Sequence, residues 1–202
     1  MPADYKSIEN RILNDVIPAT ETIDSIIHGA YYSIVRSEKL HYKEHAFDDS
    51  QKKRLANDII EGLKEFTLEK NPHYKSIDPK LFDEIFKQHV LFDLFGIRVS
   101  DLENILMSMR RITKHEIAQL ASQVSNAFYR RMLDNAFNEV KNPEDVKQGF
   151  EYLSQAYKNR GLNLPPDFND ISPKEPSLDV LKKRYLEYLN TQYQDKLNAK
   201  YG

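Results

Sequence analysis

Apolar residues recur along most of this chain at intervals of three and four positions, which is the spacing of one helix face. The pattern is clearest from Ile23 to Val35 and from Ile117 to Val140, where no proline interrupts it. Glycines are few and lie far apart, which is typical of long helices rather than of sheets joined by tight turns. The sequence therefore predicts an all-α fold, a bundle of seven or eight helices.

The most apolar stretch is residues 80–95, in which nine of the sixteen positions are large and apolar. On a regular helix these positions leave no broad polar face, so we expect neighbouring helices on every side. Asp78 is a suitable N-cap, Pro79 suits the first helical position, and Gly96 suits a left-handed end. This stretch is the predicted central helix of the fold.

The chain is divided at Pro18 and at a later segment that is rich in proline. A short helix over 4–16 is expected to stop at Pro18, because proline disrupts a helix interior. Residues 162–177 contain four prolines and little periodicity, which indicates a linker. The predicted organisation is a helical core domain over 1–161, this linker, and a C-terminal helix over 178–202.

The C-terminal helix has a tyrosine-rich face that includes Tyr185, Tyr188 and Tyr193. Tyrosine combines an apolar ring with a polar tip and is enriched at protein interfaces. The helix is expected to pack either on its own core or on a protein partner, and a second copy of the chain is one such partner.

Composition narrows the function without selecting one. The 202 residues have a formal net charge of −2, so nothing in the total charge favours nucleic acid or an anionic membrane as the main partner. Cysteine is absent, which fits a reducing compartment, and the start of the chain lacks the apolar run of a signal peptide. We expect a cytoplasmic protein without a membrane span, and leave open export without a classical signal peptide.

One cluster has the residue types of a metal site. If residues 37–47 are helical, then Glu38, His41 and His45 share a face and are able to hold a divalent metal ion such as zinc or iron. His41 to His45 also reads H-x-x-E-H, the pattern of a family of zinc hydrolases. No third ligand accompanies it and the mixed α/β context is missing, so a solvated helix end is the competing interpretation.

Residues 113–132 resemble a DNA-binding helix-turn-helix. In that interpretation Ser125 lies near the start of the recognition helix, and Arg130 and Arg131 lie near phosphates. The turn glycine is replaced by Ser122, and apolar periodicity continues unbroken through 120–128. That periodicity favours a single straight helix.

No complete catalytic constellation is present in the sequence, which contains no nucleophile elbow and no glycine-rich phosphate loop. The leading hypothesis is therefore a non-catalytic helical module that binds a protein partner or regulates one, without a cofactor. The alternatives are a DNA-binding regulator using segment 113–132 and a metal-dependent hydrolase or metal-binding protein using Glu38, His41 and His45.

Overall fold

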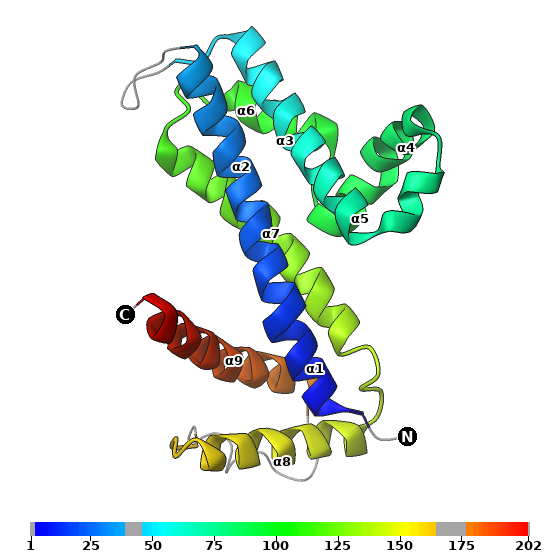
Figure 1. Ribbon diagram of the computed structural model, residues 1–202, viewed down its shortest axis with the longest axis vertical. Helices are drawn as coiled ribbons and strands as arrows, with labels where there is room; N and C mark the ends of the chain where they lie inside the picture. Colours follow the sequence, from blue (N-terminus) through cyan, green and yellow to red (C-terminus); the bar gives the residue numbers. More distant parts are fainter. Residues whose placement is uncertain (1–2, 39–45, 165–176, 202) are drawn as a thin grey trace. The chain divides into compact units, whose positions relative to one another are not determined.

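The computed structural model describes residues 3–38, 46–164 and 177–201, and every regular element within them is helical (Figure 1). The predicted all-α class is confirmed. Some of the helices follow one another without a break. Apart from a short 3-10 helix at Pro72–Ser76, each uninterrupted run counted once gives seven helices among the described residues, within the predicted range. The elements are α1 (Tyr5–Arg11), α2 (Ile17–Ser37), α3 (Asp49–Lys70), α4 (Pro79–Ile85), α5 (Leu91–Phe95), α6 (Val99–Ser108), α7 (Lys114–Ala136), α8 (Pro143–Asn159) and α9 (Leu178–Tyr201).

Several helices begin at the caps that the sequence supplies. The Asp48 carboxylate accepts the Gln51 N–H at 2.8 Å, and the Gln51 side chain accepts the Asp48 N–H at 2.9 Å. Asn142 caps α8 by accepting the Asp145 N–H at 2.9 Å. Each cap satisfies an N–H group that has no partner within the helix, and is worth about 1 kcal/mol.

The predicted stop at Pro18 is wrong, because a π-helical turn at Ile12–Val16 carries the chain from α1 into α2. In this turn the Ile17 N–H donates to the Ile12 carbonyl, five residues back rather than four. Proline lacks an N–H, and in a regular helix its ring collides with the carbonyl four residues earlier. The wider turn immediately before Pro18 relieves that collision, so the helix continues to Ser37.

Internal contacts divide the chain into two units. Unit 1 consists of residues 1–17 and 132–202, and unit 2 consists of residues 18–131. The domain boundary predicted at residue 161 lies inside unit 1, between α8 and α9, and stays a prediction. Most of the predicted linker, residues 165–176, lies outside the described residues.

Unit 2 is built from α3 to α6 together with most of α2 and α7, and aromatic rings join its helices. The Phe128 ring of α7 lies 5.8 Å from the ring of Phe66 in α3 and 5.7 Å from the ring of Phe95 in α5. Tyr31 of α2 stacks on Phe47 at 5.9 Å, and both side chains are buried. Burying such side chains provides roughly 2 kcal/mol each, which holds these helices together.

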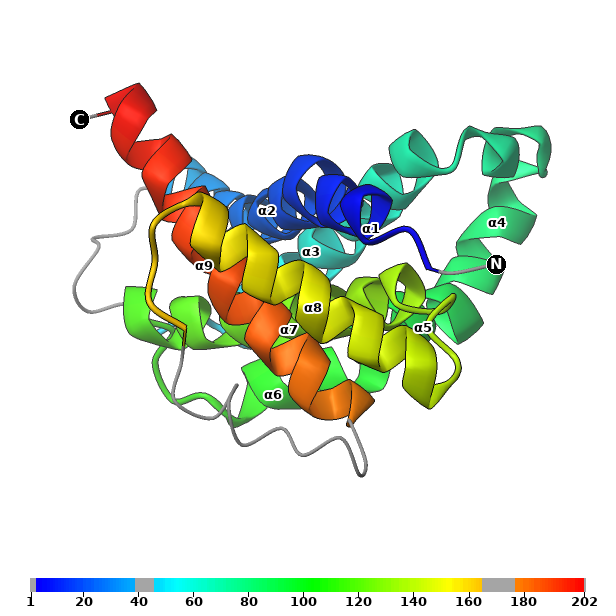
Figure 2. The same ribbon diagram turned by 90° about the horizontal axis from the view of Figure 1, so that it is seen from below.

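Unit 1 is organised around α1, α8 and α9, and Figure 2 shows α8 and α9 lying side by side. The Tyr185 ring of α9 lies 6.2 Å from the Tyr5 ring of α1 and 5.5 Å from the Phe137 ring. Gly149 of α8 allows this packing, since a Cβ there would lie 2.6 Å from Leu181 and 2.7 Å from Tyr5. The C-terminal helix thus packs on its own chain, one of the two expected arrangements.

Burial on every side, predicted for the helix over 80–95, is wrong. Leu81 is 50% exposed and Phe92 is 39% exposed, and α4 lies at the outer edge of unit 2, beyond α3 (Figure 1). The buried positions are Phe82, Phe86, Leu91 and Phe95. The helix therefore packs on unit 2 through one face and is not its centre.

Two helical glycines, Gly29 in α2 and Gly62 in α3, provide a matched test of how closely these two helices approach each other. A Cβ at Gly62 would lie 2.6 Å from Ile26 of α2, whereas a Cβ at Gly29 would meet nothing within 4 Å. Alanine suits a helix interior better than glycine by about 1 kcal/mol, whereas overpacking costs about 1–3 kcal/mol. We expect Gly29→Ala to raise the melting temperature and Gly62→Ala to lower it, as measured by circular dichroism. Equal shifts in both variants would contradict the close approach of α2 and α3.

Candidate functional site

The predicted metal site is described only at Glu38. Its carboxylate Oε1 lies 3.1 Å from a guanidinium nitrogen of Arg54, so Glu38 is held in an ion pair with α3. His41 and His45 lie outside the described residues. Within the described ranges, no three histidine or acidic side chains are grouped to share a metal ion. The metal site therefore stays a prediction.

Residues 113–132 do not form the helix-turn-helix that was considered as an alternative, and the single straight helix that the periodicity favours is what the structure contains. The α7 helix runs from Lys114 to Ala136 and passes through Ser122 without a turn. Ser125 is buried, and its hydroxyl donates to the Ala121 carbonyl at 2.7 Å, so it does not face a ligand. Arg130 and Arg131 are exposed. Unbroken apolar periodicity was the stronger signal in this segment.

Two of the three α9 tyrosines that were predicted to bind a partner, Tyr185 and Tyr188, are buried inside unit 1. Tyr185 is 0% exposed and Tyr188 is 3% exposed, so both are core residues of the fold as described. The Tyr185 hydroxyl donates to the Tyr5 carbonyl at 3.0 Å, which ties α9 to the start of α1. The side chain of Tyr193 is outside the described residues.

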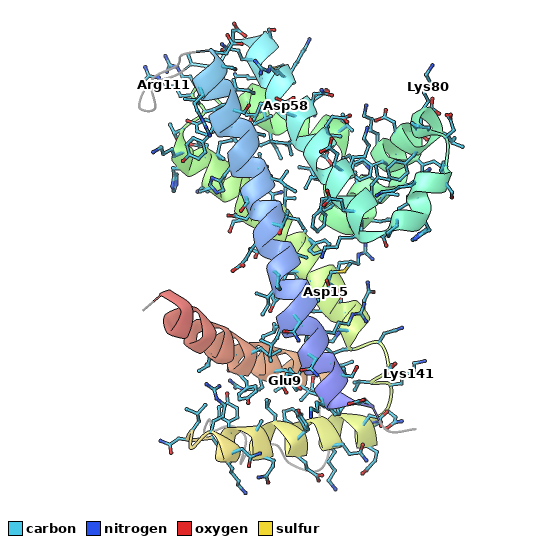
Figure 3. All side chains as sticks on the ribbon, in the orientation of Figure 1. Glu9, Asp15, Asp58, Lys80, Arg111 and Lys141 are labelled. Carbon is cyan, nitrogen blue, oxygen red and sulfur yellow. The ribbon has the colours of Figure 1, made fainter. Side chains whose placement is uncertain are left out.

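Hydroxyl groups in this tyrosine cluster have partners inside the unit. Tyr5 donates to the Asp145 carbonyl, and Tyr152 donates to the Glu9 carboxylate at 2.9 Å. Figure 3 labels Glu9 on α1. Burial, reinforced by the negative charge of Asp145, raises the pKa of Tyr5 to about 12, and burial also raises the pKa of Tyr185. The tyrosine cluster therefore belongs to the core of unit 1, and its burial favours the protonated form of these phenols.

A different surface is offered by the outer side of α4 and α5. Between these helices a second π-helical turn, Phe86–Val90, replaces a regular turn, and the Leu91 N–H donates to the Phe86 carbonyl. The buried face of this helix consists of Phe82, Phe86, Leu91 and Phe95. The residue immediately before each of them is aliphatic, and these four preceding residues form a row of their own along the helix. We call this the aliphatic row: Leu81, Ile85, Val90 and Leu94. Leu81 is exposed and the other three are half-buried.

Ion pairs fix the opposite flank of α4 to α3. The Lys64 ammonium lies 2.9 Å from the Asp83 carboxylate and 2.8 Å from that of Glu61, and Lys87 lies 3.0 Å from Asp83. Hydrogen bonds from Lys64 and Lys87 lower the pKa of Asp83. Although burial opposes it, the hydrogen bonds to Glu61 and Asp83 raise the pKa of Lys64. These charges pair with one another, which leaves the aliphatic row as the apolar surface of this helix.

Phe92 is exposed but already in contact with a cation. The Arg98 guanidinium lies 4.1 Å from the centre of its ring, a cation–π arrangement worth about 0.5–1 kcal/mol at an exposed site. Phe92 therefore does not belong to the aliphatic row.

Unit 2 also contains two open pockets. One, of about 360 Å³, lies between α3 and the start of α4, and its apolar lining includes Leu68, Ile77 and Phe82. The other, of about 640 Å³, is lined by the segment between α6 and α7, including Arg110 and Arg111. Figure 3 labels Arg111. Glu116 places a carboxylate in that second pocket, which opposes the binding of an anion.

Comparison with known proteins adds no identification. None of the protein-family models matches the chain, and the comparisons with curated proteins and with solved structures returned no match either. In the described part of the chain, none of the helices combines the length and the apolarity that crossing a bilayer requires.

The tyrosine cluster predicts how unit 1 responds to alkaline pH. An unfolded tyrosine loses its proton near pH 10.0, whereas folded Tyr5 holds it to about 12. Between these values the unfolded state binds fewer protons, so its free energy falls relative to the folded state by about 1.4 kcal/mol per pH unit for each such tyrosine. The contribution of Tyr5 to the free energy of unfolding should therefore not vary with pH below about 10, and should decrease as the pH rises above it. Urea unfolding followed by circular dichroism should show a smaller decrease for Tyr5→Phe, and an unchanged decrease would contradict this assignment.

Proposed function

We propose that this protein is a helical interaction module that binds a protein through the aliphatic row of α4 and α5, without a catalytic step. The observation that carries the proposal is that four aliphatic side chains lie in register along the outer helix of unit 2, one of them exposed and three half-buried. A single exposed leucine is common on protein surfaces, but a continuous row is typical of a docking site.

The position of the row supports this proposal. Its helix begins at a cap, where Asp78 accepts the Leu81 N–H at 3.3 Å, and ends at Gly96 in the left-handed conformation. The buried face and the Lys64–Asp83 pair hold the helix against unit 2. A row on a helix held in this way is already in its binding conformation, so little conformational entropy is lost on docking.

The geometry of the row favours a helical partner. Residues spaced by about one turn form a ridge that fits between the side chains of another helix, and helix-in-groove recognition uses such anchors. The exposed stripe beside the row contains Glu84, Gln88, His89 and Asp93. An apolar centre with a polar rim is the usual anatomy of an interface between proteins.

Site-specific photo-crosslinking tests the proposal. A benzoylphenylalanine at Leu81 should form a covalent adduct with a protein in cells that express the chain, whereas the same group at Asn104, exposed on α6, should not. Adding Val90→Glu to the Leu81 variant places a charge in the row and should reduce adduct formation at least about tenfold, while the melting temperature changes little. The absence of adducts from Leu81, Ile85 and Val90 alike would disprove the proposal.

A further inference from the structure

The occupant of the aliphatic row is indicated by the charges beside it. Along the exposed stripe the ionisable residues alternate between basic and acidic: Lys80 stands at the beginning, followed by Glu84, then His89 and finally Asp93, with the neutral Gln88 between the second and the third. Figure 3 labels Lys80 at the start of α4. The two ends of this series, Lys80 and Asp93, are therefore opposite in charge.

This order complements itself when it is reversed. If two such helices lie antiparallel with their rows in contact, then Leu81 of one meets Leu94 of the other and Ile85 meets Val90. The same alignment brings Lys80 close to Asp93 and Glu84 close to His89, twice each. In a parallel pair about a two-fold axis the two charged stripes would lie on opposite sides of the contact, so Lys80 would not meet Asp93.

We propose that the row binds a second copy of this chain, with the two α4–α5 helices packed antiparallel about a two-fold axis. A two-fold interface uses the same patch on both chains, so the patch has to complement itself, which this one does in apolarity and in charge. Antiparallel packing also brings the positive end of one helix dipole near the negative end of the other. This inference rests on the proposed function and specifies its partner.

The other charged residues of this helix and its end do not oppose this arrangement. Asp83 and Lys87 lie on the opposite flank and are already paired with each other and with Lys64. Arg98 lies over the Phe92 ring. The Lys80 and Asp93 side chains therefore supply the charges at the two ends of the row.

The size of the row determines how strong the dimer should be. From Leu81 to Leu94 the helix rises about 20 Å, at about 1.5 Å per residue. A row of this length and one side chain in width covers less than the roughly 800 Å² per partner that a stable complex usually buries. The dimer should therefore be weak, with a dissociation constant in the micromolar range or above.

Sedimentation equilibrium of the full chain over a wide range of concentrations tests the inference. We expect a reversible monomer–dimer equilibrium, and we expect Ile85→Glu to raise the dissociation constant at least about tenfold. Asn104→Glu, which adds the same charge on α6, should leave it within about twofold. A chain that stays monomeric at every concentration, or a dimer that Ile85→Glu leaves unchanged, would overturn the inference.

Charge reversal tests the antiparallel alignment. Lys80→Glu and Asp93→Lys should each raise the dissociation constant about fivefold, and the double variant should return it close to that of the original chain. Both substitutions also improve the match between side-chain charge and helix dipole, so neither is expected to unfold the helix. Failure of the double variant to recover binding would overturn the antiparallel alignment.

The crosslinking and sedimentation results are separable. An adduct from Leu81 at twice the mass of the chain supports self-association. An adduct of any other mass, together with a monomer in sedimentation, would support the aliphatic row as a docking surface. The same result would disprove the inference that a second copy of the chain binds there. The loss of all adducts would disprove both.

Discussion

The π-helical turn at Phe86–Val90 is the constraint on which the proposed interaction surface depends. Nine residues of regular α-helix turn through about 900°, which would place Leu91 on the side opposite Phe82. The five-residue turn removes about one residue of rotation, so Phe82, Phe86, Leu91 and Phe95 all reach the interior. Burying these four side chains together is worth several kcal/mol, which outweighs the less favourable geometry of one turn.

The same turn creates the aliphatic row. Each of the four buried residues is preceded by an aliphatic one. The change in rotation at the π-helical turn that brings the buried residues onto one face also brings their aliphatic predecessors into one row. The polar residues are thereby divided between the flank that pairs with α3, which carries Asp83 and Lys87, and an exposed stripe beside the row. One local change of helix geometry thus determines which residues are buried, which remain accessible, and how charge is distributed beside them.

Sequence reasoning recovered what regular periodicity determines and failed where the period changes. The α7 helix followed from unbroken three- and four-residue spacing, and Asp78 was recognisable as a cap. Both π turns were missed. At Pro18 the rule that proline ends a helix was applied without the wider turn that accommodates the ring. In residues 80–95 the 4-5-4 spacing of the buried residues was mistaken for apolarity on every side.

The aliphatic row was missed for the same reason, although the signal was present in the pairing of each buried residue with an aliphatic predecessor. The tyrosines of α9 are a different case. Composition alone does not distinguish a tyrosine that faces a partner from one whose hydroxyl donates to a carbonyl 180 residues away, as Tyr185 does to Tyr5. Only the tertiary structure brings those two segments together.

The contact between Tyr185 and Tyr5 has a consequence for biosynthesis. Unit 2 is a single continuous stretch of chain, so its helices are able to assemble while the ribosome is still translating the remainder. Unit 1 combines a segment that precedes unit 2 with segments that follow it, and α1 has to wait for α9 before its tyrosine is enclosed. Until α9 has been synthesised, Tyr5 lacks its contact with Tyr185, and the order of synthesis therefore makes unit 1 complete only after unit 2.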